Sequence, residues 1–469
     1  MAMLTFSELI ARLPEQESEV ARQQIVELLK RSGIRIAVLD DDPTGIQTVH
    51  DCLLLTNDRP ANVATAMAAA EPFFYLLTNT RSMTAADAEH TVRRGMDAIL
   101  DANGPAGHPL IFISRSDSTL RGHFPLEPTV MRAVLDERGV RVNLPVFFVP
   151  SFFEAGRHTV DDVHYMRDGE AMIPVADTEF ARDNVFGYRH SNLKGYILEK
   201  SAYSIQEACI GHLPLELLRG ESPAAITTRI ETLRDCAYVT VDAMDYGDLR
   251  KFSIALLSLL EKSRGSVVLR TSSSLPKALS GIEDLPLLDR AICARRSGPG
   301  LFIVGSHVRK TTQQLQALLA APGVEGVEID ILSVLGAPEK LLPEVLEKLK
   351  NLYDRGTVGA IYTSREELRL DDPAARLGMG QKISAFLVKI VQSLPFQPAY
   401  LVSKGGITSH DILTTGLGIE RARVLGQILP GVPALLTGDD NRYPQMPFII
   451  FPGNVGTEEA LREVFEKLR

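Results

Sequence analysis

The stretch Ile36-Ala-Val-Leu-Asp-Asp-Asp-Pro-Thr-Gly-Ile-Gln-Thr-Val-His-Asp51 decides how the chain is predicted to fold. Its first four residues are apolar and predict a buried parallel strand, which Pro43 and Gly45 then terminate. Three carboxylates, Asp40 to Asp42, follow at the end of that strand. Ligands bind at the carboxyl ends of strands in an open α/β sheet, and acids packed this closely must be compensated. One Asp is often a helix cap, but three exceed that need, so we expect at least one to be functional.

The same arrangement, a strand that ends in polar residues, recurs further along the chain. Phe73 to Leu77 predicts a strand leading into Thr78-Asn-Thr-Arg81, and another predicted strand, from Leu110, leads into Asp117-Ser-Thr-Leu-Arg-Gly122. The guanidinium groups of these segments suit a carboxylate or phosphate, and their hydroxyl groups suit sugar-like oxygens. The strand ends therefore predict one crevice for a small oxygen-rich anion. A plain ion pair between Asp117 and Arg121, four residues apart, is the simpler alternative.

Composition narrows the class of protein. The chain has 469 residues, a formal net charge of -9 and 45% hydrophobic residues, so we expect no general attraction to nucleic acid or to an anionic membrane. No apolar run approaches the ~20 residues of a transmembrane helix, and the N-terminus lacks a signal-peptide pattern. We therefore expect a cytoplasmic protein.

The sequence predicts neither a metal site nor a set of disulfide bonds. The four cysteines show no CxxC spacing. Metal-binding side chains do gather in one segment, but their spacing follows no established metal motif: His158, Asp161, Asp162 and His164.

A domain boundary is predicted in the irregular segment from Gly281 to Gly300. The resulting division is an N-terminal domain at 1–285, a linker at 286–300 and a C-terminal domain at 301–469. The second domain again alternates strands with helices, and several of its strand ends are rich in Gly, which lets backbone N–H groups approach phosphates. These residues predict a nucleotide pocket: Ser306, Gly405, Gly406, Thr408, Gly453, Asn454 and Gly456. The predicted fold is α/β, with two domains that each contain a mainly parallel sheet flanked by helices. It is Rossmann-like without a P-loop, because no GxxxxGK[ST] sequence is present.

The ordered set of motifs resembles the four-carbon acid sugar kinase family. The resemblance rests on Asp41-Asp-Pro-Thr-Gly45, Thr78-Asn-Thr-Arg81, Asp117-Ser-Thr-Leu-Arg-Gly122, Lys404-Gly-Gly-Ile-Thr408 and Pro452-Gly-Asn-Val-Gly456. It implies an N-terminal domain that binds the acid sugar and a C-terminal domain that binds the nucleotide. It also implies ATP-dependent phosphorylation of tetronates such as threonate, erythronate or an oxo-tetronate, and a homodimer.

Residue roles follow from the resemblance. Asp42 and Asp41 are the candidates for the catalytic base. The residues expected to bind the substrate are Thr44, Gly45, Arg81, Asp117, Ser118, Thr119 and Arg121. Those expected to bind ATP are Ser306, Gly405, Gly406, Ile407, Thr408, Gly453, Asn454 and Gly456. Mg²⁺ would arrive on the phosphates, which need few protein ligands. Arg81 and Arg121 are expected to hold the substrate carboxylate, and the two domains are expected to close on the substrates.

Two other functions remain open. Ile36 to Thr44 also fits the hhhhDxDxT pattern of haloacid-dehalogenase-like phosphatases, with Asp40 as nucleophile, Asp42 as acid/base and Thr78 as a further hydroxyl. In that alternative, Asp439 and Asp440 would supply the last acidic motif. The other alternative is a non-catalytic acid-sugar sensor, which binds the acid without turnover.

Overall fold

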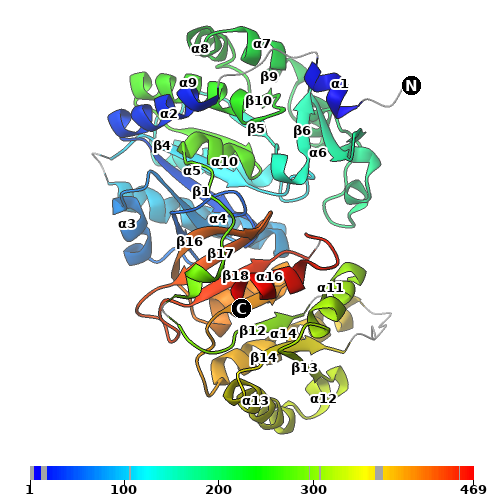
Figure 1. The fold of residues 1–469 in the computed structure, drawn as a ribbon. Helices are drawn as coiled ribbons and strands as arrows, with labels where there is room; N and C mark the ends of the chain where they lie inside the picture. The colour runs from blue at the N-terminus through cyan, green and yellow to red at the C-terminus, as the bar shows by residue number, and fades with distance from the viewer. Residues whose placement is uncertain are drawn as a thin grey trace. The chain divides into compact units, whose positions relative to one another are not determined.

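The computed structural model describes residues 5–11, 18–104, 107–294, 296–305, 308–364, 373–453 and 455–469. The chain divides into two compact units, Met1–Asp284 and Leu285–Arg469. Each unit is built on its own set of mainly parallel strands (Figure 1). The predicted α/β class is confirmed.

Eight parallel strands form the sheet of the first unit, in the order β2-β3-β1-β4-β11-β5-β10-β9. The predicted strands after residue 35 are present with small shifts at their ends. The bounds are β1 (Arg35–Asp40), β2 (Leu53–Leu55), β3 (Phe73–Leu77), β4 (Leu110–Arg115), β5 (Val146–Val149), β9 (Ile210–Leu213), β10 (Tyr238–Val241) and β11 (Val267–Thr271).

Helices cover both faces of this sheet. One face buries alternate strand residues such as Leu39 and Phe74 against Val92, Met96 and Met131, which belong to α4 and α5. On the other face Phe147 of β5 packs edge-on against Phe252 of α9. The helices of this unit are α1 (Phe6–Ala11), α2 (Ser18–Ser32), α3 (Pro60–Ala68), α4 (Ala85–Asn103), α5 (Leu126–Glu137), α6 (Leu193–Lys200), α7 (Leu215–Gly220), α8 (Pro223–Thr232), α9 (Tyr246–Ser263) and α10 (Ser274–Ser280).

A small antiparallel sheet, absent from the sequence prediction, lies between β5 and α6 along the chain. Its strands are β6 (Arg157–Val160), β7 (Val163–Asp168) and β8 (Ala171–Pro174), paired in that order. Asp161 and Asp162 form the turn between β6 and β7, and both have positive φ angles, 53° and 61°. Positive φ at both central residues is typical of a two-residue hairpin turn. The short helical turns η3 (Val175–Asp177) and η4 (Glu179–Arg182) follow.

The second unit has the strand order β13-β14-β12-β15-β18-β17-β16. The pairs from β13 to β18 are parallel, whereas β17 pairs antiparallel with both β18 and β16. The strands are β12 (Leu301–Val304), β13 (Val324–Ile329), β14 (Val358–Thr363), β15 (Leu401–Lys404), β16 (Arg421–Leu429), β17 (Val432–Thr437) and β18 (Pro447–Phe451). The long strand β16 was not predicted from the sequence.

The helices of the second unit pack on these strands. Leu315 and Leu318 of α11 and Val464 and Phe465 of α16 enter one core with Phe302, which lies in β12. Cys293, within the segment predicted as a linker, is buried in the same core. The helices are α11 (Arg309–Leu319), α12 (Ile331–Gly336), α13 (Pro338–Asp354), α14 (Pro373–Ser393), α15 (Gly406–Asp411) and α16 (Ala460–Leu468), and a π-helical segment, η7 (Ile412–Gly416), follows α15.

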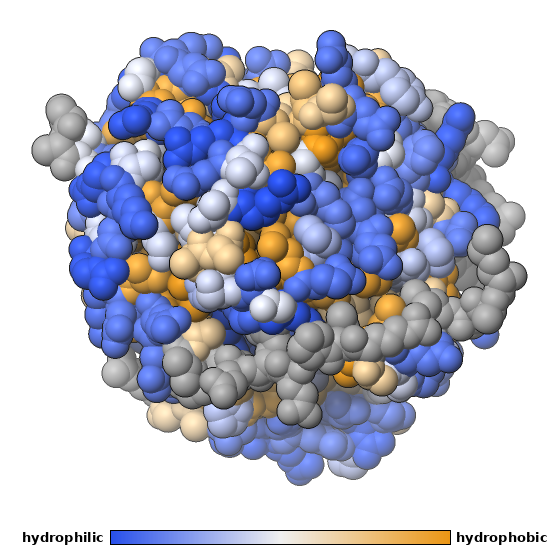
Figure 2. All heavy atoms as spheres, turned by 90° about the horizontal axis from the view of Figure 1, so that it is seen from above, coloured by the Kyte–Doolittle hydropathy of each residue, from blue (hydrophilic) through white to orange (hydrophobic). Residues whose placement is uncertain are grey.

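The surface gives no sign of an extended apolar band on the face drawn in Figure 2, where hydrophobic residues form small patches among hydrophilic ones. Within the described ranges, every helix is too short or too polar to cross a membrane.

Candidate functional site

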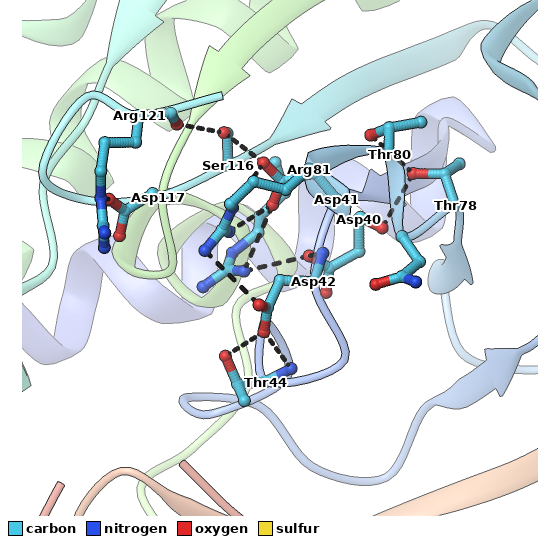
Figure 3. A network of polar contacts seen from close by, with 12 residues as sticks. Asp40, Asp41, Asp42, Thr44, Thr78, Thr80, Arg81, Ser116, Asp117 and Arg121 are labelled. Carbon is cyan, nitrogen blue, oxygen red and sulfur yellow. Dashed lines mark hydrogen bonds and ion pairs between the residues drawn. The ribbon is translucent and has the colours of Figure 1, made fainter. Parts of the chain in front are cut away.

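Strand register brings the predicted acids and arginines of the first unit together. Asp40, the last residue of β1, pairs with Leu77 of β3 on one side and with Arg115 of β4 on the other. The polar residues that follow these strands therefore emerge at one level of the sheet edge. Figure 3 shows Asp40, Asp41, Asp42, Arg81, Ser116, Asp117 and Arg121 gathered there.

The carboxyl group of Asp40 is buried and contacts Arg115. Its side chain is 1% exposed, and Arg115 donates from Nη1 to Oδ1 at 3.0 Å. Arg115 also donates from Nη2 to Oγ of Ser273. Burial raises the pKa of Asp40 to about 7, with Arg115 opposing the rise and the neighbouring acids adding to it. A Cβ at Gly45 would overlap this carboxylate, so glycine is required there for a steric reason.

Asp41 is also buried, and it holds Arg81 in place. Arg81 donates two hydrogen bonds to this carboxylate, from Nε at 3.1 Å and from Nη2 at 2.5 Å. Ser116 donates a third from Oγ at 2.5 Å. The Asp41 side chain is only 1% exposed, and its two oxygens accept the hydrogen bonds that hold Arg81 and Ser116 in place.

Asp42 is the most open of the three acids. Its side chain is 21% exposed and accepts hydrogen bonds from the backbone N–H and the hydroxyl of Thr44. Nη1 of Arg81 lies 3.4 Å from its other oxygen. Burial would raise the pKa of Asp42, but Arg81 and Thr44 outweigh it and hold the pKa below its ordinary value. Asp42 is therefore ionised and reachable at neutral pH.

The segment from Asp117 to Arg121 forms a second charged group. Nε of Arg121 donates to Asp117 at 2.7 Å, and the Thr119 hydroxyl donates to the same carboxylate. Nη1 of Arg121 also lies 3.7 Å from Asp183, and its guanidinium sits 5.0 Å above the ring of Phe180. Burial would raise the pKa of Asp117, but the charges of Arg81 and Arg121 hold it well below its usual range. The ion pair considered from the sequence is thus present within the site.

Side chains from distant elements fix this segment through its backbone. His164 bonds to the carbonyl oxygen of Ser118 at 2.8 Å, and the hydroxyl groups of Tyr188 and Tyr196 donate to the carbonyls of Thr119 and Leu120. From the sequence, His164 was considered only as a possible metal ligand, and Tyr188 and Tyr196, which lie in the segment after the small sheet, were not singled out. Their only sequence signal is a large polar aromatic side chain in an otherwise apolar setting, which is not specific.

A buried ion pair between Arg270 and Glu127 links side chains from several elements around the site. Arg270 of β11 donates to Glu127 at 2.5 Å and to Ser114, and Thr80 donates to the other oxygen of Glu127. A Cβ at Gly122 would approach Arg270 and overlap the Ser116 hydroxyl, so this glycine also permits close packing. Glu127 and Arg270, which lie within α5 and β11 and follow no motif, were not singled out from the sequence.

The histidines and acids of the 158–164 segment do not converge on a metal centre. His158 faces the carbonyl oxygen of Met244, while Nδ1 of His164 bonds to Thr159. Burial lowers the pKa of both histidines to about 4, which keeps them neutral. Across the described residues, no group of three or more His, Cys, Asp or Glu side chains is arranged to hold a metal ion.

In the second unit, the residues predicted to bind nucleotide follow three neighbouring parallel strands. The register places Val304 of β12 beside Lys404 of β15, and Lys404 beside Phe451 of β18. A Cβ at Gly305 would overlap the side chain of Thr408, so the segments after β12 and β15 touch. Gly405 and Gly456 have φ angles of 110° and 83°, which glycine adopts without strain. Ser306 and Asn454 lie outside the described residues.

Lys404 joins two of these segments. Its buried ammonium donates to the carbonyl oxygens of Pro452 at 2.6 Å and Gly453 at 3.1 Å, and it lies 4.1 Å above the ring of Phe451. Burial lowers the pKa of Lys404 to about 7, and the nearby charge of Lys310 acts in the same direction. Ile407, by contrast, is 73% exposed beside Gly405 and Gly406.

The geometry does not favour the phosphatase alternative. Its nucleophile, Asp40, is buried against Arg115. The Thr78 hydroxyl donates a hydrogen bond to the backbone carbonyl oxygen of Asp40 at 2.9 Å, so it is already engaged. Asp439 and Asp440, its last motif, follow β17 of the other unit.

Comparisons with known proteins agree with the expected division of the chain into a sugar-binding domain and a nucleotide-binding domain. Residues 36–279 match the family model of a sugar-binding N-terminal domain, and residues 301–461 match that of a nucleotide-binding C-terminal domain. A search of curated proteins found no significant match.

Two solved structures share the fold over nearly the whole chain. A protein from Salmonella typhimurium LT2, described as a candidate tRNA synthase, aligns with a TM-score of 0.68 and 16% identity, over 93% of this chain and 99% of its own. A Haemophilus influenzae protein aligns with a TM-score of 0.65 and 15% identity, over 92% of this chain and 100% of its own. Together with the matched domains, the motifs show that this chain belongs to the four-carbon acid sugar kinase family, in which a sugar-binding N-terminal domain precedes a nucleotide-binding C-terminal domain.

Proposed function

We propose that the protein is an ATP-dependent kinase that phosphorylates a hydroxyl group of a small acid sugar, a tetronate such as threonate, erythronate or an oxo-tetronate. The observation that carries the proposal is that a sugar-binding and a nucleotide-binding domain occur in one chain, and that the first gathers carboxylates and arginines at its sheet edge. The described nucleotide-binding unit offers Gly405, Gly406 and Gly453 beside the buried Lys404. These residues suit the phosphates of ATP.

Asp42 is the proposed catalytic base. It is the one acid of the Asp40 to Asp42 cluster that is both ionised and partly exposed, so it can accept a hydrogen bond from the acceptor hydroxyl. A carboxylate with a low pKa is a weak base, but phosphoryl transfer through a loose transition state asks mainly for positioning and charge neutralisation. Asp41 orients Arg81, and Thr44 orients Asp42.

Mg²⁺ that arrives bound to ATP takes most of its ligands from phosphate oxygens and water, so it needs few ligands from the protein. When bound, Mg²⁺ would neutralise charge on the transferred phosphoryl group. Thr44, Gly45, Asp117, Ser118, Thr119 and Arg121 would line the acid sugar.

The test is release of ADP from Mg-ATP in the presence of C4 and C5 aldonates and oxo-tetronates, with p-nitrophenyl phosphate as the phosphatase control. We expect acid-dependent ADP release, and D42N should lower kcat by about 10²- to 10⁴-fold, the usual contribution of a general base, while ATP affinity stays unchanged. Asp58→Asn is the matched control, because Asp58 pairs with Arg94 at the surface.

Three results would contradict the proposal. Wild-type turnover in D42N would remove Asp42 from the mechanism. Cleavage of p-nitrophenyl phosphate without acid-dependent ADP release would favour the phosphatase. Binding of the acid with no turnover would identify a sensor.

A further inference from the structure

The arginines around the sugar site are nearly all neutralised by the protein's own acids. Arg81 pairs with Asp41 and Asp42, and Arg121 pairs with Asp117 and Asp183. The deeper Arg115 and Arg270 pair with Asp40 and Glu127. A substrate carboxylate that bound to any of these guanidinium groups would compete with a carboxylate already in place.

Arg157 differs from these arginines. Among the described residues it has no acidic partner within ion-pair distance, and its Nη1 donates to the carbonyl oxygen of Ala155. Its Nε is buried without a hydrogen-bond partner. A buried unpaired donor on a charged group is costly, so this guanidinium is suited to an anion that the protein itself does not supply.

The position of Arg157 in β6 places it beside the charged segment of the site. Side chains alternate along a strand, so Arg157 and Thr159 share one face, and His158 lies on the other, against Phe6 and Phe153. Thr159 bonds to His164, and His164 bonds to the carbonyl oxygen of Ser118. The face of β6 that carries Arg157 is therefore the face directed toward the segment from Asp117 to Arg121.

The charges near Arg157 agree with this placement. Burial lowers the pKa of Arg157, and the groups whose charges act on it are Asp117, Arg121 and Glu179. Asp117 makes its direct contacts with Arg121 and Thr119, and its charge acts on Arg157 without an ion pair between the two side chains.

We propose that Arg157 binds the carboxylate of the acid sugar and so selects acids over neutral polyols, an inference that rests on the proposed substrate class. A guanidinium offers a planar pair of donors that matches a carboxylate, and the ligand would supply the missing negative charge. Arg81 and Arg121 then act by orienting Asp42 and Asp117 toward the hydroxyl groups of the sugar.

The test measures binding without turnover, so that it does not depend on phosphoryl transfer. Threonate and erythronate, and the uncharged polyols threitol and erythritol, are titrated calorimetrically into the full-length wild type, R157Q, R157K and R81Q. R167Q is the matched control, because Arg167 lies in β7 of the same small sheet and pairs with Glu170. Thermal unfolding of each variant, compared with that of the wild type, shows that the unit Met1–Asp284 is folded.

We expect R157Q to weaken binding of the acids by about 10- to 100-fold, the loss typical of a charge-assisted hydrogen bond, and to leave the weak binding of the polyols unchanged. R157K should recover part of the affinity, and R167Q should bind like the wild type.

Acid binding by R157Q that equals the wild type overturns the inference, as does a selective loss of acid affinity in R81Q alone. If R157Q loses the acid while the wild type shows no acid-dependent ADP release, the kinase proposal fails and the role of Arg157 stands. A wild type that binds none of the acids overturns both.

Discussion

At the scale of single residues, three adjacent aspartates have different roles because their surroundings differ. Asp40 is buried against Arg115, Asp41 is buried against Arg81, and Asp42 alone is partly exposed. The sequence indicates that such acids must be compensated, but it does not tell which arginine compensates which acid. That assignment depends on strand register, which brings Arg115 beside Asp40 from 75 positions along the chain.

The raised pKa of Asp40 leads to a prediction about stability and pH. The pKa is about 7 in the folded protein and 3.8 as the reference value, so the fold favours the protonated form. The resulting stabilisation is fully present below about pH 4 and is lost as the pH rises through about 7. Asp40→Asn cannot titrate, so between pH 5 and pH 8 the variant should gain about 3 kcal/mol relative to the wild type.

Urea denaturation of both proteins across that pH range provides the measurement. The difference between their free energies of unfolding should change with pH in the stated direction. Parallel curves would show that Asp40 is ionised throughout and that Arg115 outweighs its burial.

At the scale of elements, the sequence predicted the parallel strands well and the small sheet not at all. Continuous apolar runs such as Phe73 to Leu77 identify buried strands directly. The strands β6 and β7 are short, with polar residues such as His158, Thr159 and His164 among their apolar ones, so they resembled a loop. The Asp161-Asp162 pair was a usable signal for a hairpin turn, but from the sequence these acids were considered only as weak candidates for metal binding.

Lys404 gives a prediction for the strand ends of the second unit. In Lys404→Met the carbonyl oxygens of Pro452 and Gly453 lose their donor, and β15 and β18 lose the link between their ends. We expect the Kd for ATP to rise by about 10- to 100-fold, with tetronate affinity unchanged, because the lost hydrogen bonds are charge-assisted.

Calorimetric titration of both ligands measures this effect, and Lys350→Met is the control, because Lys350 lies exposed on α13 and pairs with Asp354. An unchanged affinity for ATP in Lys404→Met would show that the nucleotide does not depend on these segments.

At the scale of the whole molecule, the mainly parallel α/β class could be predicted because each apolar run is followed by a turn and then by a helical pattern. The antiparallel end of the second sheet could not, since β16 alternates buried and partly exposed residues and contains Arg421, Arg423 and Gln427. Such alternation, interrupted by a bulge near Gly426, is a weaker signal than a continuous run.

Two compact units with different proposed ligands lead to a prediction about thermal unfolding. ATP should stabilise the unit Leu285–Arg469, and a tetronate should stabilise the unit Met1–Asp284. At a hundred times Kd each ligand contributes about 2.7 kcal/mol, which corresponds to a shift of roughly 5–10 °C for units of about this size. Differential scanning calorimetry should therefore show ligand-specific shifts, whereas equal shifts of a single transition would show that the units unfold together.

The exposed Ile407 has a practical consequence. The chain contains no tryptophan, so its intrinsic fluorescence comes from tyrosine alone. An indole at position 407, where a side chain is 73% exposed next to Gly405 and Gly406, would be the sole long-wavelength emitter of the protein. Substitutions at such open positions rarely change stability by more than about 0.5 kcal/mol. Position 407 is therefore a suitable place for a fluorescent reporter of ligand binding at the end of β15.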